Sequence, residues 1–152
     1  MATLKGVHYK SLLLSAIMAG YFIHFANFFF DGFLGMFSNQ MAPLQNEQWG
    51  FLFGHMFNSI FFAWVYAKYA MNRLPGPNII KGIIYGVILY VVVMVTMMIV
   101  SAGGGTFAAR MAGMTTAMMI GGLINHMVWG GFIGALYNDE HCLNKEGKKC
   151  CC

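Results

Sequence analysis

Four long apolar runs, separated by short polar segments, make up most of this chain. Each run is long enough to cross the hydrocarbon core of a bilayer as an α-helix, which takes about 20 residues. Gly and Met are frequent inside the runs, which membrane helices tolerate, whereas a membrane barrel would need short alternating strands. The pattern therefore predicts an all-α polytopic membrane protein with four transmembrane helices, over residues 11–30, 49–69, 79–100 and 113–137.

The composition excludes a soluble globule and a disordered chain. Of the 152 residues, 59% are apolar and 9% are charged, whereas a soluble domain carries about 25% charged residues. Disorder requires low hydrophobicity together with high charge. The net charge of +4 does not indicate a nucleic-acid partner, because the basic residues form no dense patch. We expect a single membrane domain, residues 1–152, surrounded by the lipid bilayer.

Eight of the nine basic residues flank the apolar runs on one side of the membrane. They lie before the first run, around the turn between the second and third runs, and after the fourth, whereas Arg110 alone lies on the other side. The positive-inside rule then places both termini in the cytoplasm, as in a bacterial inner-membrane protein. The first run can also be read as a cleaved signal peptide, but it is too long for one and no small-residue cleavage site follows Phe30.

An internal repeat relates the two halves of the chain. At an offset of 71 residues, His55 falls on His126, and two small residues four apart in the second run fall on two glycines four apart in the fourth. Small residues at this spacing allow helix backbones to approach closely in lipid. We predict two tandem two-helix repeats, at about 10–70 and 79–137, followed by a cytoplasmic tail at 138–152.

Three histidines lie inside three different apolar runs. His24 follows the basic residue before its run by 14 residues, and His55 and His126 each precede the polar residue that ends their run by 13. At about 1.5 Å per residue, all three lie about 20 Å from the cytoplasmic edge. Polar residues at this depth usually face the protein interior. The sequence therefore predicts three imidazoles at one level of the bundle.

These histidines suggest a cofactor site between facing helices. Neutral imidazoles of His55 and His126 can hold the iron of a haem b axially, and His24 can hydrogen-bond there or replace one of the pair. Small residues would leave room for the porphyrin: Gly54, Ser59, Gly121, Gly122, Gly130 and Gly131. A site beside a membrane quinone is the related possibility. The structural alternative is that each imidazole donates to a backbone carbonyl or an Asn of a neighbouring helix, with no cofactor bound.

Copper is a second metal to consider, since Cu(I) favours thioether and imidazole ligands and the chain has 14 Met. Two groups of Met occur at helical spacing: Met94, Met97 and Met98, and Met111, Met114 and Met118. Adjacent His and Met side chains project about 100° apart on a helix, which makes joint ligation difficult. Met is also an adaptable packing residue.

Several signatures of other functions are missing from the sequence. No Asp or Glu lies deep in an apolar run, and an ion-coupled transporter usually needs one. We find no Glu-x-x-His pair of a di-iron site, no phosphate-binding loop and no nucleophile–base arrangement. The protein is therefore not expected to be an enzyme on its own.

The tail ends in Cys150, Cys151 and Cys152 after two lysines. Cysteines beside a membrane are the usual targets of S-acylation, so these three are possible lipidation sites. A reduced thiol cluster, a metal-binding tip with His141 and Cys142, and a solvated basic tail are the alternatives. Stable disulfides are not expected in a reducing cytoplasm.

The segment 49–137 resembles uncharacterised four-helix inner-membrane proteins of bacteria. The residues that carry the resemblance are the Pro75-Gly76-Pro77 turn, the Gly82-x-x-Tyr85-Gly86 start of the third run, and the His126-x-x-x-Gly130-x-x-x-Gly134-x-x-Tyr137 ending of the fourth. The resemblance covers about half of the chain and implies the membrane fold, without an activity.

Size, membrane location and buried histidines together suggest a small subunit of a larger membrane complex with other membrane subunits as partners. We expect a respiratory or electron-transfer complex, with haem b or a quinone near the histidines. A structural or assembly subunit is the first alternative, and a small transporter or channel formed by oligomerisation is the second.

Overall fold

The protein is an all-helical bundle in the part of the chain that the computed structural model describes, which is residues 7, 9–34, 48–104, 108 and 111–137. Its four long helices are α1 (Tyr9–Leu34), α3 (Gln48–Val65), α4 (Asn78–Ser101) and α6 (Thr116–Leu136). A π-helical turn, η2 (Tyr66–Ala70), continues α3. No strand occurs in these residues, so the predicted all-α class is confirmed, and each helix covers most of one predicted run.

Two of the helices, α4 and α6, are long and apolar enough to cross a membrane. Both have apolar side chains on nearly every side, and large ones point outward along α4, including Ile88, Val92 and Val95. This supports a membrane protein. Four spans, the inner membrane and the cytoplasmic termini stay predictions from the sequence.

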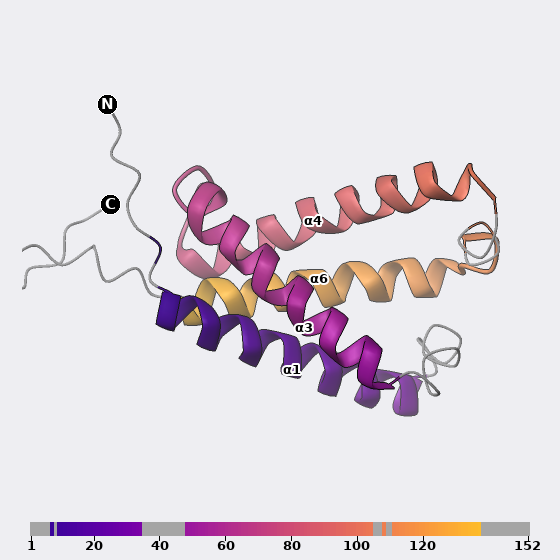
Figure 1. Ribbon diagram of the computed structural model, residues 1–152, viewed down its shortest axis with the longest axis horizontal. Helices are drawn as coiled ribbons and strands as arrows, with labels where there is room; N and C mark the ends of the chain where they lie inside the picture. Colours follow the sequence, from indigo (N-terminus) through magenta and orange to yellow (C-terminus); the bar gives the residue numbers. More distant parts are fainter. Residues whose placement is uncertain (1–6, 8, 35–47, 105–107, 109–110, 138–152) are drawn as a thin grey trace, which may run out of the picture.

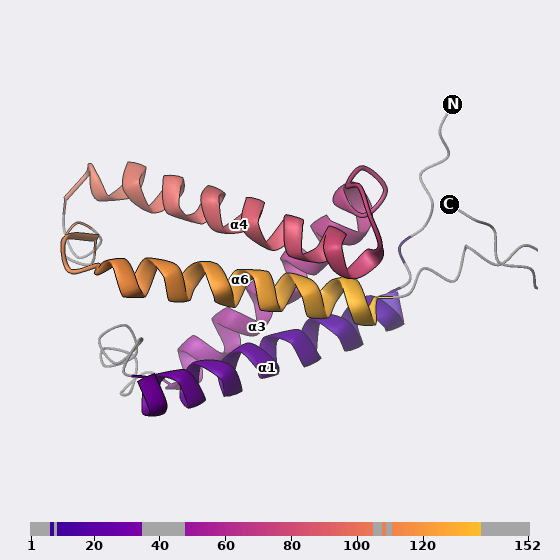
Figure 2. The same ribbon diagram turned by 180° about the vertical axis from the view of Figure 1, so that it is seen from behind.

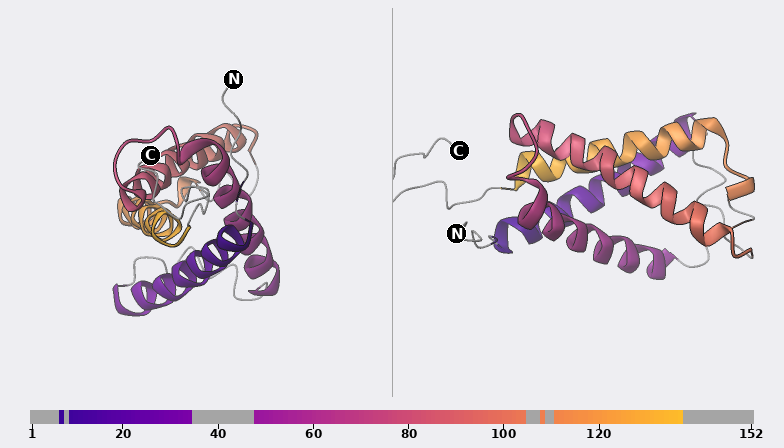
Figure 3. Two further views of the ribbon diagram at one scale, coloured as in Figure 1. Left: turned by 90° about the vertical axis from the view of Figure 1, so that its left-hand side faces the viewer. Right: turned by 90° about the horizontal axis from the view of Figure 1, so that it is seen from above.

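The helix α6 lies at the centre of the arrangement. It packs against α4 on one side and α1 on the other, so that the three helices lie side by side (Figure 2). The helix α3 crosses one face of this row and contacts α1 (Figure 1). The start of α1, the turn η2, the start of α4 and the end of α6 all lie at one end of the bundle (Figure 3). We call it the Pro75 end, after the turn between η2 and α4.

Local sequence explains where the helices begin and end. Gly76 has φ of +95°, a left-handed conformation that its missing Cβ permits, and Pro77 is extended before α4 starts. At the other end, the Thr115 hydroxyl accepts a hydrogen bond of 3.3 Å from the Met118 N–H and caps α6. The Pro75 turn and the Thr115 cap thus set two of the helix starts.

Glycines bring α4 and α6 into backbone contact. A Cβ on Gly82 would overlap the carbonyl oxygen of Gly130, and a Cβ on Gly130 would overlap that of Gly82. Gly86 lies in the same way against the His126 carbonyl, and Gly134 against that of Asn78. The glycines four apart therefore do what their spacing predicts: they allow two apolar helices to approach closely.

The contact between α1 and α3 also uses small residues, but in another register. Ser59 donates a hydrogen bond of 2.7 Å to the carbonyl of Ala16. In the predicted repeat, Ser59 corresponds to Gly130, and Ser11 corresponds to Gly82, which contacts Gly130. An equivalent contact would therefore join Ser59 to Ser11, but Ser59 contacts Ala16. The contact between the two helices of the first hairpin is thus shifted by about five residues from the contact in the second hairpin. The tandem repeat stays a prediction from sequence.

Candidate functional site

A buried serine joins three helices near the middle of the bundle. The Ser59 hydroxyl of α3 donates to Ala16 O of α1 and accepts a hydrogen bond of 2.8 Å from Trp129 Nε1 of α6. Ser59 and Trp129 are only 5% and 4% exposed. Since both polar groups are satisfied inside the protein, this contact fixes the relative positions of three helices at one level, which we call the Ser59 layer.

Aromatic side chains connect this layer to the Pro75 end. The ring of Trp129 lies 6.1 Å from that of Tyr85, which lies 5.2 Å from that of Tyr66. The Tyr85 hydroxyl donates to Phe62 O at 2.9 Å, and the Tyr66 hydroxyl donates to Asn78 O at 3.3 Å. The phenol groups therefore tie α4 to α3 and η2, in addition to its packing against α6.

The three predicted histidines lie on α1, α3 and α6, each about one turn from the Ser59 layer. His55 precedes Ser59 by four residues, and His126 precedes Trp129 by three. His24 comes four residues after Gly20, and Gly20 lies against Ser59. In each case the displacement is about 4.5–6 Å away from the Pro75 end, from the helical rise. This backbone arrangement supports a common level, while the side chains of His24 and His55 lie outside the described part.

The described imidazole, that of His126, lies between α6 and α4. Its Nδ1 lies 2.8 Å from Gly122 O of its own helix, and because a carbonyl oxygen only accepts, Nδ1 must carry a proton. In the neutral ring Nε2 then has the lone pair, which is the arrangement of a metal-ligating histidine. The Tyr90 ring meets the imidazole edge-on at 5.4 Å, and its hydroxyl donates to Met119 O at 2.8 Å. Tyr90 and Gly122 thus hold the imidazole in place.

The small residues expected to make room for a porphyrin are partly used for packing. Gly130 is in backbone contact with α4, and a Cβ on Gly122 would lie 3.1 Å from the Tyr90 ring. Ser59 is the centre of the three-helix contact. The expectation of open space at these three positions is wrong, since in lipid close helix contact is itself a main use of small residues. A porphyrin bound to His126 would have to lie on another side of the imidazole.

No group of three or more His, Cys, Asp or Glu side chains able to hold a metal occurs in the described residues. Of the Met groups considered for copper, Met118 is buried, and its sulfur accepts a hydrogen bond of 3.4 Å from the Thr115 N–H. That contact supports the start of α6. The possible lipidation sites Cys150, Cys151 and Cys152 lie outside the described residues.

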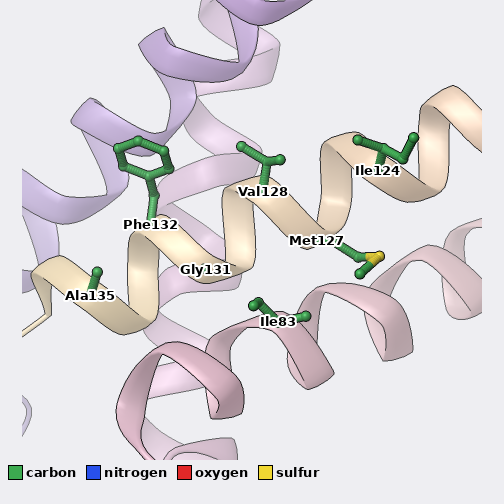
Figure 4. Close-up of a pocket in the computed structure, with 7 residues that line it drawn as sticks. All are labelled: Ile83, Ile124, Met127, Val128, Gly131, Phe132 and Ala135. Carbon is green, nitrogen blue, oxygen red and sulfur yellow. The ribbon is translucent and has the colours of Figure 1, made fainter.

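A shallow apolar groove runs along the outer face of α6, on the side that α3 does not cover (Figure 4). Ile83 of α4 lines one edge, and the rest comes from α6: Ile124, Met127, Val128, Gly131, Phe132 and Ala135. At the α1 side, Phe132 stacks on Phe22 with ring centroids 4.1 Å apart. Because the groove has no polar side chain, it has no group for catalysis.

The sequence analysis did not anticipate the Ser59–Trp129 bond. A signal for it exists, since a Trp in an apolar run has an N–H that needs an acceptor when buried. The sequence cannot say which acceptor, because 70 residues separate the two partners. Comparisons with protein family models, with curated proteins and with solved structures found no match to this chain.

Proposed function

We propose that this protein is a small integral-membrane subunit of an electron-transfer complex, with His126 as a ligand of haem b. The observation that carries the proposal is the hydrogen bond from His126 Nδ1 to Gly122 O, which directs the lone pair of the neutral ring to Nε2. His55 of α3 is the proposed second ligand of the haem iron. His24 of α1, about one turn from the same layer, is the alternative to it.

The surface of the bundle supports a membrane subunit. Large apolar side chains are exposed on all four helices, among them Leu14, Phe57, Ile99 and Ile120. In water such a surface would aggregate, whereas lipid tails and neighbouring transmembrane helices cover it at little cost. A one-electron carrier within this surface would exchange electrons with a membrane quinone or with another subunit.

An absorption spectrum tests the haem. Protein purified in mild detergent from haem-sufficient cells is measured oxidised and then reduced with dithionite. We expect a Soret band and a sharper α-band on reduction, and we expect His126→Ala to lose both. Asn125→Ala is the matched control on the adjacent residue, and it should keep the spectrum. A purified, folded wild-type protein without a Soret band, or a His126→Ala variant with an unchanged one, would refute the proposal.

A structural or assembly subunit is the second candidate, and the surroundings of His126 also favour this role. The His126 Nδ1–H is already satisfied within its own helix, and Tyr90 packs against the ring. No buried side-chain nitrogen or oxygen in the described part lacks a hydrogen-bond partner. If this role is correct, co-purification of partner subunits should persist in His126→Ala and should fail when the Ser59 layer is broken.

A further inference from the structure

An outward strip of α3 and η2 combines aromatic rings with a single cation. Phe57 and Phe61 are 70% and 47% exposed, and the half-buried Trp64 and Lys68 follow on the same side, with Trp64 packed partly against the core. The spacing of four, three and four residues keeps side chains on one face of a helix. The strip thus runs from apolar rings within the span to a charged group at the Pro75 end.

The π-helical turn adds a second ring beside the cation. Residues five apart lie about 140° apart around an α-helix, whereas the wider i→i+5 turn brings residue i+5 close to residue i. Accordingly, the Tyr69 ring meets the Trp64 ring edge-on at 5.9 Å. Lys68 Nζ lies 4.6 Å from the Trp64 ring centroid and 5.2 Å from that of Tyr69. The two rings hold the ammonium group in place through cation–π contacts.

Further positive charge lies at the same end of the bundle. Arg73 is exposed in the Pro75 turn, and Lys81 lies in the first turn of α4, which contacts η2. The one acidic residue in the described ranges, Asp31, lies near the far end of α1. At the Pro75 end, therefore, no carboxylate of the described chain neutralises these cations.

We propose that Phe57, Phe61, Trp64, Lys68 and Tyr69, the α3 strip, bind one anionic phospholipid. The acyl chain lies along the exposed rings, and the phosphate accepts hydrogen bonds from the Lys68 ammonium. Trp and Tyr rings prefer the headgroup level of a bilayer, and basic side chains at that level attract anionic lipids. The strip is about 18 Å long over the 12 residue steps from Phe57 to Tyr69, from the helical rise, which suits a chain-plus-headgroup ligand. The inference rests on the proposed membrane location and is independent of the haem.

Charge complementarity favours a lipid over a protein partner. A transmembrane partner helix would cover Phe57 and Phe61 equally well, but it would need an acidic side chain at headgroup depth to match Lys68. Anionic phospholipid presents its phosphate at that depth throughout the membrane. We therefore commit to the lipid and treat a protein occupant as an outcome of the test.

Native mass spectrometry of the detergent-solubilised full chain measures the binding. Phosphatidylglycerol and phosphatidylcholine are titrated separately, and inorganic phosphate is added as a competitor. We expect phosphatidylglycerol to bind preferentially and Lys68→Gln to weaken it about fivefold, the effect of one basic residue at the membrane surface. Lys10→Gln removes the same charge at the same end, outside the strip, and should change the affinity less than twofold.

Four results would overturn the proposal. The first two are equal binding of both lipids, and equal effects of Lys68→Gln and Lys10→Gln on the affinity. The third is complete displacement of the lipid by inorganic phosphate. The fourth is a photo-crosslinker at position 61 that captures protein instead of lipid in membranes. Tyr69→Leu provides a second variant, which should weaken binding while the thermal unfolding temperature stays at that of Lys10→Gln. Lipid mass and haem absorbance are separate readouts, so either proposal can fail alone.

Discussion

Trp129 Nε1 donates a hydrogen bond of 2.8 Å to Ser59 Oγ, and the same hydroxyl donates onward to the Ala16 carbonyl at 2.7 Å. This chain of two bonds crosses from α6 through α3 to α1. Between membrane helices the hydrophobic effect contributes little, so packing and hydrogen bonds provide the specificity. The two bonds of Ser59 therefore help to determine which faces of α1, α3 and α6 meet.

Ser59→Ala should destabilise the bundle by about 1–2 kcal/mol, because it leaves the buried Trp129 N–H without its acceptor. Thermal unfolding in detergent, followed by circular dichroism, measures the loss. Thr96→Val is the control: the Thr96 hydroxyl is bonded only to Val92 O within the exposed face of α4, and its removal should be nearly neutral. Equal melting temperatures for the two variants would show that the Ser59 layer does not hold the helices together.

Gly130→Ala and Gly131→Ala form a matched pair on adjacent residues of α6. At Gly130 the new Cβ meets the Gly82 backbone, which cannot move aside, so we expect a loss of about 2 kcal/mol or more. At Gly131 the nearest atom is Ile83 Cγ1, 3.3 Å away on a flexible side chain. There the better helix propensity of Ala should keep the change within about 1 kcal/mol. The unfolding free energies of both variants, measured in one detergent, test this contrast.

Tyr90→Phe should cost about 1 kcal/mol, since it removes the bond to Met119 O and keeps the ring against His126. Tyr90→Leu should cost more, because it removes the ring contacts with Gly122 and His126 as well. Chemical denaturation followed by Trp fluorescence gives both values. Tyr9→Phe, at an exposed tyrosine at the start of α1, provides the baseline. The interpretation fails if Tyr90→Leu is no worse than Tyr90→Phe.

Cysteine labelling tests the predicted orientation. In a background with the four native cysteines replaced by Ser, Arg73→Cys and Ala102→Cys place single thiols beside opposite ends of α4, at positions that are exposed in the structure. We expect a membrane-impermeant maleimide to label position 102 in intact cells with a permeabilised outer membrane, and position 73 only in inverted vesicles. The reverse pattern would place the termini outside the cytoplasm.

The helices themselves were predictable from the sequence, because a run of about 20 apolar residues between polar segments has few alternatives to a helix in lipid. The Pro75 turn also followed from residue type, and the spacing of Gly130 and Gly134 predicted a close helix approach, whereas Gly82 as the partner of Gly130 came from the structure. The candidate site was predictable only in outline: the sequence placed His24, His55 and His126 on three helices. For Gly130 and Ser59 it left two uses open, close helix packing and room for a porphyrin, and the structure shows packing at both. At Gly122 the sequence suggested only cofactor space, whereas the Tyr90 ring lies against it.

The amino-acid sequence alone determined the all-α class, the positions of the four helices and the charge bias between their ends, all of which depend on neighbouring residues. Only the tertiary structure decided that α6 lies between α4 and α1, that Trp129 bonds to Ser59, and that η2 brings Tyr69 beside Trp64. The reason is physical. Helices that are apolar on every side carry no stripe to say which face turns inward, so single polar groups and glycines far apart in the chain make that choice together.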